Sequence, residues 1–202
     1  MSSANQSISI INGRLIDPAN QIDDMLDLHI SQGHVLAIGE KPSGFEAEKL
    51  IDASGRIICP GLIDLSARLR EPGSEPKGTI ASETRAAAHA GITTLVTLPD
   101  TNPVIDTPAV IELIRRRAKQ SAHARVLCLG ALTKNLNGKE LSEMAALQNA
   151  GCVALTNAGK PLGNTLIERR ALEYASTFGI RVFIKPEDRH LRNDGCVHEG
   201  II

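Results

Sequence analysis

The feature that most constrains this chain is an alternation of apolar strands with helix-forming segments that begins at residue 57. Strands are predicted at 57–65, 92–98, 125–130, 152–156 and 180–184, a spacing of roughly thirty residues. The first of these segments is almost continuously apolar, which is typical of a parallel-sheet strand that is buried on both faces. Repeated βαβ units of this kind form either a (β/α)8 barrel or an open doubly wound sheet.

Helices are predicted between these strands because residues that begin and end helices stand at the expected places. Thr79 and Asn164 are suitable N-caps, and Thr107 with Pro108 opens another helix. The predicted helices are 79–90, one that begins at 107, 139–149 and 164–178, and three of them are followed by the glycines Gly91, Gly151 and Gly179.

The first 58 residues predict a separate, strand-rich module with a small β-sandwich. Its expected strands are 7–11, 14–16, 27–30, 34–38 and 49–52. Asn12-Gly13 is typical of a tight hairpin turn and predicts that the first two strands pair with each other. We therefore expect a β-sandwich module at 1–58 and the N-terminal portion of a barrel at 59–202.

Composition excludes several classes of function. A net charge of −1 gives no electrostatic reason to expect nucleic acid or an anionic membrane as a partner. No apolar run is long enough to span a membrane and the first residues lack a signal-peptide pattern, which predicts a cytoplasmic protein. The cysteines are widely spaced, so buried free thiols are favoured over disulfides; they are Cys59, Cys128, Cys152 and Cys196.

A barrel is favoured over an open sheet by the position of the unusual residues. The segments 64–70 and 99–101, together with Asn157 and Lys185, follow successive predicted strands. Barrels assemble their sites from residues at these carboxyl ends. No glycine-rich phosphate loop follows the first strand, so a dinucleotide-binding sheet has little support.

The sequence resembles the dihydroorotases of the amidohydrolase superfamily in four ordered motifs. Residues 60–73, Pro-Gly-Leu-Ile-Asp-Leu-Ser-Ala-Arg-Leu-Arg-Glu-Pro-Gly, resemble the family's first-strand signature, which ends in Asp-x-His-x-His-x-Arg-Glu-Pro-Gly. Residues 91–103, 151–159 and 185–188 resemble three further family motifs, and 198–200 also matches in place. The resemblance implies an α/β fold with part of a metal-dependent-hydrolase barrel.

The residues at the family's metal-ligand positions depart from its pattern. Ser66 and Arg68 stand for two histidines, Asn157 for an aspartate and Lys185 for a later histidine. A shifted alignment puts Ala158 at the third position and also loses the ligand. Active members use zinc, which binds imidazole and carboxylate, whereas arginine and lysine repel a cation. No cofactor is predicted, and the two cations are expected to fill the cavity by pairing with carboxylates.

Arg70 matches the family arginine that holds the substrate carboxylate, a role suited to a guanidinium fork. The companion asparagine is Asp100 here, which would repel that carboxylate. We favour a structural role in which Arg70 pairs with Asp100, Asp64 or Glu71, with retained ligand binding as the alternative.

Two further features have simpler explanations. Cys196-x-His198 lacks a second ligand pair and is interpreted as incidental. The run 115–117 of three arginines is interpreted as a solvated helix face, with a protein contact as the alternative.

The resemblance is strongest to the bacterial dihydroorotase homologue that accompanies aspartate carbamoyltransferase as a non-catalytic subunit. It implies an inactive subunit in de novo pyrimidine biosynthesis that forms a hetero-oligomer with the transferase catalytic chain and a homodimer. Two alternatives remain: an active cyclic-amide hydrolase with altered metal use, and a small-molecule sensor that uses the former substrate pocket.

The predicted strands account for about five of the eight in a barrel, and family members are about twice this long. A sheet of this size would have apolar edges, which proteins normally cover. We therefore expect either the N-terminal part of a longer protein or a truncated product that another chain completes.

Overall fold

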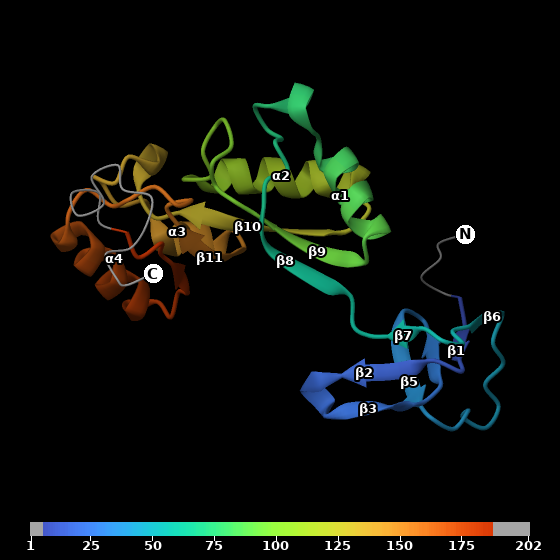
Figure 1. Cartoon of the computed structure of the whole chain (residues 1–202). Helices are drawn as coiled ribbons and strands as arrows, with labels where there is room; N and C mark the ends of the chain where they lie inside the picture. The colour runs from blue at the N-terminus through green and yellow to red at the C-terminus, as the bar shows by residue number, and fades with distance from the viewer. Residues whose placement is uncertain (1–5, 188–202) are drawn as a thin grey trace, which may run out of the picture. The chain divides into compact units, whose positions relative to one another are not determined.

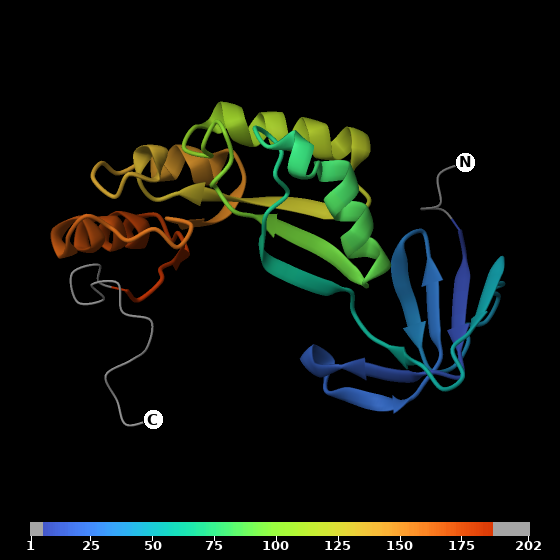
Figure 2. The same cartoon turned by 45° about the horizontal axis from the view of Figure 1, so that its top comes forward.

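A computed structural model describes residues 6–187 and divides the chain into two compact units, Met1–Pro60 and Gly61–Ile202. The first unit contains a four-stranded sheet in the order β5-β4-β1-β6 and a three-stranded sheet in the order β3-β2-β7 (Figures 1 and 2). Its strands are β1 Ile8–Ile11, β2 Arg14–Asp17, β3 Ile22–Met25, β4 Leu28–Ser31, β5 His34–Ile38, β6 Lys49–Asp52 and β7 Ile57–Ile58.

The predicted hairpin at Asn12-Gly13 is wrong, although both flanking strands exist. β1 pairs with β4 and β6, whereas β2 pairs with β3 and β7, so the chain passes from one sheet to the other at this turn. Asn12 holds the crossing because its N–H donates to Asp27 Oδ1 at 3.0 Å and its Nδ2 donates to Asp52 Oδ1 at 3.1 Å. A side chain at Gly13 would lie 2.6 Å from Ile58 Cδ1, so the close approach of the sheets requires glycine there.

The second unit is built on a parallel sheet of five strands in the order β12-β11-β10-β9-β8 (Figure 1). Each strand lies beside the one that precedes it in the chain, which is the order of a barrel wall. The strands are β8 Leu62–Ala67, β9 Ile92–Thr97, β10 Arg125–Ala131, β11 Cys152–Thr156 and β12 Val182–Phe183; the helices are α1 Ile80–His89, α2 Pro108–Ser121, α3 Met144–Asn149 and α4 Thr165–Thr177. The α/β fold with five strands of a barrel is confirmed.

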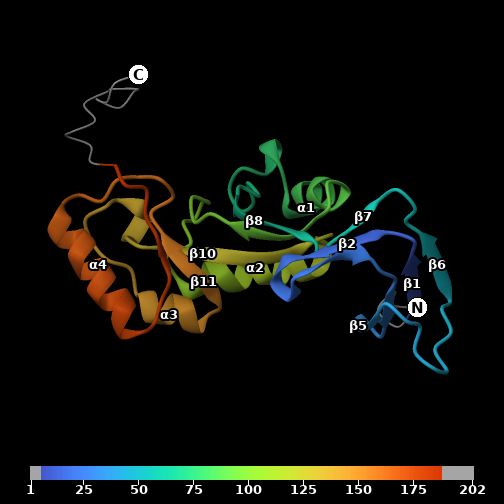
Figure 3. The same ribbon diagram turned by 60° about the horizontal axis from the view of Figure 1, so that its bottom comes forward.

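Side chains from both faces of the sheet form separate apolar clusters. The larger cluster joins Leu95, Cys128 and Leu155 of the strands to Ile111 and Leu147 of the helices. In Figure 3, α2 and α3 run along β10 and β11, which they contact. The opposite face carries a smaller cluster of inward side chains, as a barrel interior does: Val96, Leu98, Leu129 and Ala154.

The predicted first strand, 57–65, is interrupted at Pro60-Gly61, and its two parts join different sheets. The expectation that this strand is buried on both faces is wrong, since Leu62, Ile63 and Leu65 are all more than half exposed. The reason is position: within the described chain, β8 is the end strand and has only β9 as a neighbour.

The helix predicted at 139–149 begins only at Met144. The preceding residues are held against the end of β10 instead. Ser142 Oγ donates to the Ala131 carbonyl at 2.5 Å, and Lys134 Nζ pairs with Glu140 Oε1 at 2.5 Å. These contacts hold the segment in a non-helical conformation.

The cysteines are partly as expected. Cys128 and Cys152 are buried and stand opposite each other on β10 and β11, and burial raises the pKa of each thiol to about 12. Such thiols are unreactive near neutral pH because the thiolate is the nucleophile. Cys59 is exposed, contrary to expectation, and Cys196 lies outside the described residues. No helix within residues 6–187 is long and apolar enough to cross a membrane.

Candidate functional site

The loop that follows β8 is fixed by the carboxylate of Glu71. Its Oε2 accepts the backbone N–H of Ile80, the first residue of α1, at 2.8 Å, and its Oε1 accepts from Arg117 Nη1 at 3.0 Å. A carboxylate at a helix N-terminus is favoured by the unpaired N–H groups and the helix dipole. Glu71 therefore joins the loop to α1 and to α2.

Arg117 belongs to the arginine run that was predicted to be a solvated face, and for this residue the prediction is wrong. Its guanidinium also lies 3.4 Å from Glu75 Oε1. The Gly73 N–H donates to both oxygens of Glu75 at 3.1 Å, and this bond, with a smaller contribution from Arg117, holds the pKa of Glu75 below its usual value. No local pattern indicates this cluster, because Arg117 lies 46 residues from Glu71 and 42 residues from Glu75 along the chain.

The loops after β8 and β9 contact each other directly. Asn102 N–H donates to the Pro72 carbonyl at 3.0 Å. Gly73 has a φ of +101°, and a side chain there would lie 2.4 Å from the Asn102 carbonyl oxygen. The two family motifs thus hold each other in place through backbone contacts that only glycine permits.

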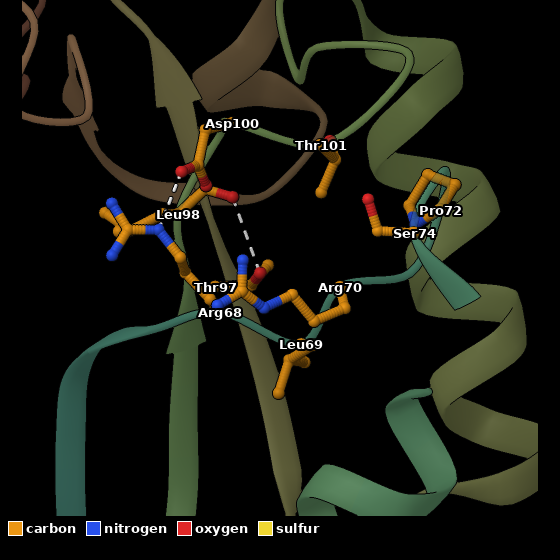
Figure 4. Close-up of a pocket in the computed structure, with 9 residues that line it drawn as sticks. All are labelled: Arg68, Leu69, Arg70, Pro72, Ser74, Thr97, Leu98, Asp100 and Thr101. Carbon is orange, nitrogen blue, oxygen red and sulfur yellow. Dashed lines mark hydrogen bonds and ion pairs between the residues drawn. The ribbon is translucent and has the colours of Figure 1, made fainter. Parts of the chain in front are cut away.

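Arg68 and Asp100, which follow β8 and β9, form an ion pair at the carboxyl end of the sheet. Arg68 Nε donates to Asp100 Oδ2 at 2.7 Å, as Figure 4 shows. The Asp100 side chain is 28% exposed and that of Arg68 is 46% exposed. The expectation that Arg68 pairs with a carboxylate is confirmed, and the pair reduces the repulsion that an isolated Asp100 would exert on an anion.

Lys185 and Ser66, at two further positions where the family pattern has metal ligands, also have local hydrogen-bond or ion-pair partners. Lys185 Nζ forms an ion pair with Glu187, so this cation does pair with a carboxylate, but the cavity that the two cations were expected to fill remains open. Ser66 lies where the pairing of β8 with β9 shifts register, and its N–H donates to Asp64 Oδ1 at 2.8 Å. Asp64 therefore stabilises the local backbone.

Asn157, at the end of β11, is buried in a hydrogen-bond network. Its Oδ1 accepts from Thr133 Oγ1 at 2.7 Å and its Nδ2 donates to the Lys160 carbonyl at 3.2 Å. Thr133 Oγ1 in turn accepts the Gly138 N–H at 3.0 Å. Donation and acceptance both require an amide, because an ionised aspartate only accepts. Thr133 was not predicted as a member of this site.

Arg70 does not make the ion pair that the sequence analysis favours. The three carboxylates proposed as its partners are engaged elsewhere, and Arg70 has no ion pair among the residues the structure describes. Its guanidinium is exposed beside a small pocket that Ser74 and Thr101 also line (Figure 4). This arrangement leaves Arg70 able to bind an anion.

A wider hollow opens over the ends of β8, β10, β11 and β12. Its walls are largely apolar, with Ser66, Arg68 and Lys185 among the lining residues. Between residues 6 and 187, no three His, Cys, Asp or Glu side chains are grouped so that they could hold a metal ion. His198 and Cys196 lie outside the described residues.

Comparison with known proteins assigns this architecture to a family. The model described as "Dihydro-orotase-like" matches residues 55–202. The chain is 50% identical over 194 residues to a "Dihydroorotase-like protein" of Pseudomonas aeruginosa and 43% identical over 195 residues to a "Dihydroorotase" of Syntrophotalea carbinolica. Each alignment covers 96% of this chain and 46% of the relative, so the chain spans about half the length of these relatives.

Solved structures show the same fold at low sequence identity. An L-hydantoinase from Arthrobacter aurescens matches with a TM-score of 0.78 at 20% identity, over 94% of this chain and 42% of the hydantoinase. A D-hydantoinase matches with a TM-score of 0.74 at 22% identity, over 93% of this chain and 42% of the other. At these identities the likeness concerns the fold alone.

We predict that Asn157→Asp destabilises the protein by about 1–3 kcal/mol, the cost of an unsatisfied buried polar group. The carboxylate cannot donate to the Lys160 carbonyl, and residue 157 is only 4% exposed. Urea unfolding measures the difference. Asn137→Asp is the matched control: within residues 6–187 this exposed side chain only accepts hydrogen bonds, which a carboxylate also can, so stability should change by less than about 0.5 kcal/mol. Equal stability of the two variants would contradict the structural role of the amide.

Proposed function

Because this chain belongs to the dihydroorotase-like family, we propose that it is a catalytically inactive subunit of de novo pyrimidine biosynthesis. In this proposal it acts in the cytoplasm and assembles with the catalytic chain of aspartate carbamoyltransferase, as a hetero-oligomer that also contains a homodimer of this subunit. Its contribution is a rigid frame, and the family's hydrolytic chemistry has been lost.

The observation that carries the proposal is the ion pair between Arg68 and Asp100. Arg68 stands at a family ligand position, cannot lose its proton in a protein and repels a metal cation. Its partner, Asp100, stands at the position of a family substrate-binding residue. One interaction therefore occupies two positions on which metal binding and substrate binding would depend.

The remaining donor set does not fit zinc either. Zinc in hydrolases is held by imidazole nitrogen and carboxylate oxygen and lowers the pKa of a bound water. Here Ser66 offers a neutral hydroxyl, Lys185 an ammonium, and Asn157 an amide already bonded on both sides. No step of hydrolysis is therefore assigned to this site.

The intact frame supports a role in assembly. Glu71, Gly73 and Asn102 hold the loops after β8 and β9 in place. A fold that keeps this geometry without the chemistry presents rigid helix faces on which another protein can pack. Loss of such a packed partner typically lowers the stability of the remaining chain, because binding stabilises the folded state by mass action.

We predict that the purified protein contains far less than one zinc per chain and does not hydrolyse dihydroorotate. Elemental analysis and the change in ultraviolet absorbance of the substrate measure the two quantities. The double variant Ser66→His/Arg68→His should remain inactive, because Asn157 and Lys185 are unchanged and Asp100 loses its cation. Stoichiometric zinc together with turnover in the unaltered protein would overturn the inactive assignment.

We also predict that the full-length protein forms a stable complex with aspartate carbamoyltransferase. Size-exclusion chromatography with light scattering, on the two proteins separately and mixed at micromolar concentration, gives the masses directly. The transferase should be less stable or less active without this subunit. Unchanged elution of both proteins, with full transferase activity in cells that lack the subunit, would refute the assembly role.

One observation favours a second candidate function, binding of a small carboxylate without turnover. Arg70 is exposed and has no ion pair in the part of the chain that the structure describes, and Asp100 is neutralised in part by Arg68. A guanidinium in this state can bind a carboxylate through two parallel hydrogen bonds. Ser74 and Thr101 line the same pocket and supply hydroxyl groups.

For this candidate, we predict that dihydroorotate binds to the purified protein and that Arg70→Gln weakens binding about tenfold, or 1.4 kcal/mol. The change removes the cation but keeps a side chain at a position whose φ is +65°, so backbone strain is similar. Isothermal titration calorimetry measures the dissociation constants. Arg85→Gln, an exposed cation on α1, is the control. Absence of binding to the unaltered protein would exclude the sensor role and leave the assembly role unaffected.

A further inference from the structure

A hollow lined by basic side chains lies where α2 ends and β10 begins. Its lining contains four cations, Arg115, Arg116, Lys119 and Arg125, and one carboxylate, Glu112. Because Arg125 is the first residue of a parallel strand, the hollow is at the amino end of the sheet, opposite the end that carries Arg68 and Asp100. We propose that this basic groove is an interaction surface for an acidic segment of a partner protein.

Three of the four cations have no partner of their own. Within residues 6–187, Arg116, Lys119 and Arg125 make no side-chain hydrogen bond or ion pair. Arg115 is held loosely, 3.8 Å from Glu112 and 3.3 Å from the Ala150 carbonyl. The adjacent Arg117 is different, since it pairs with Glu71. Three unpartnered cations are therefore gathered in one groove.

The cations near the end of α2 outnumber the one carboxylate beside them, Glu112. Arg115 and Lys119 are four residues apart, and Arg116 and Lys119 are three apart, so like charges are neighbours on one surface. An ordinary solvated helix face intersperses both signs of charge. A bound anion would remove this repulsion, and with a chain net charge of −1 the excess of positive charge is local to this surface.

The floor of the groove identifies the class of anion. It is formed by Ala118, Ala122, Ala124 and Val126, small apolar side chains that pack against the main core. Figure 3 shows α2 running along β10, which it contacts. An extended peptide with acidic residues on one side and small apolar residues on the other fits both rim and floor. Proteins that bind single-stranded nucleic acid instead combine basic patches with aromatic side chains for base stacking, and the lining contains no aromatic residue.

This inference goes beyond the proposed function because it specifies a surface and the chemistry of its ligand, whichever protein supplies the acidic segment. Failure of the transferase to associate would leave it standing. Conversely, a failure of the groove to bind an acidic peptide would leave the proposed inactive role of the other end of the sheet unaffected.

The test uses the full protein and a fluorescein-labelled peptide of alternating glutamate and alanine, with binding followed by fluorescence anisotropy at low and physiological salt. We expect saturable binding that weakens with salt. Arg116→Glu/Lys119→Glu/Arg125→Glu should weaken it by at least about tenfold. The milder Arg116→Gln/Lys119→Gln/Arg125→Gln should act in the same direction, and circular dichroism establishes that each variant is folded.

The matched control is Arg85→Glu/Lys139→Glu/Arg170→Glu, which makes the same change in net charge at exposed cations outside the groove. Binding close to that of the unaltered protein is expected. Three outcomes would overturn the proposal: no binding of the peptide, equal loss in the groove and control variants, or tighter binding of single-stranded oligothymidylate with the same dependence on the groove residues.

Discussion

The arrangement of the barrel mouth depends on the interactions of the Glu71 carboxylate. It accepts a hydrogen bond from the first residue of α1 and forms an ion pair with Arg117 on α2, so one side chain fixes the loop after β8 against two helices. The side chain is 16% exposed, and partial burial makes such a charged contact stronger than a surface pair. Arg68 and Arg70 lie on this loop, and their positions follow from its anchoring.

The polar side chains at the barrel mouth satisfy one another. Arg68 pairs with Asp100, and the Asn157 amide completes a buried network with Thr133. Every buried polar side-chain atom among the described residues has a hydrogen-bond partner. Because unsatisfied buried polar groups are costly, this pairing stabilises the folded barrel mouth.

The two ends of the sheet differ in their electrostatics. At the carboxyl end, the cations Arg68 and Lys185 each have a carboxylate partner, and Arg70 alone of the three lacks one within the described chain. At the amino end, Arg116, Lys119 and Arg125 make no side-chain hydrogen bond or ion pair within residues 6–187. The charges at the carboxyl end are therefore mostly paired within the chain, whereas those at the amino end are open to solvent.

The sequence by itself determined the order of strands and helices and the α/β class, because apolar periodicity, caps and motifs are local signals. Tertiary structure decided which groups meet. Arg68, not Arg70, pairs with Asp100, and Arg117 reaches Glu71 from another helix. Likewise, the strands on either side of Asn12-Gly13 join separate sheets. Such contacts join residues 32 or 46 positions apart, and their geometry depends on strand register and helix packing, which no local pattern encodes.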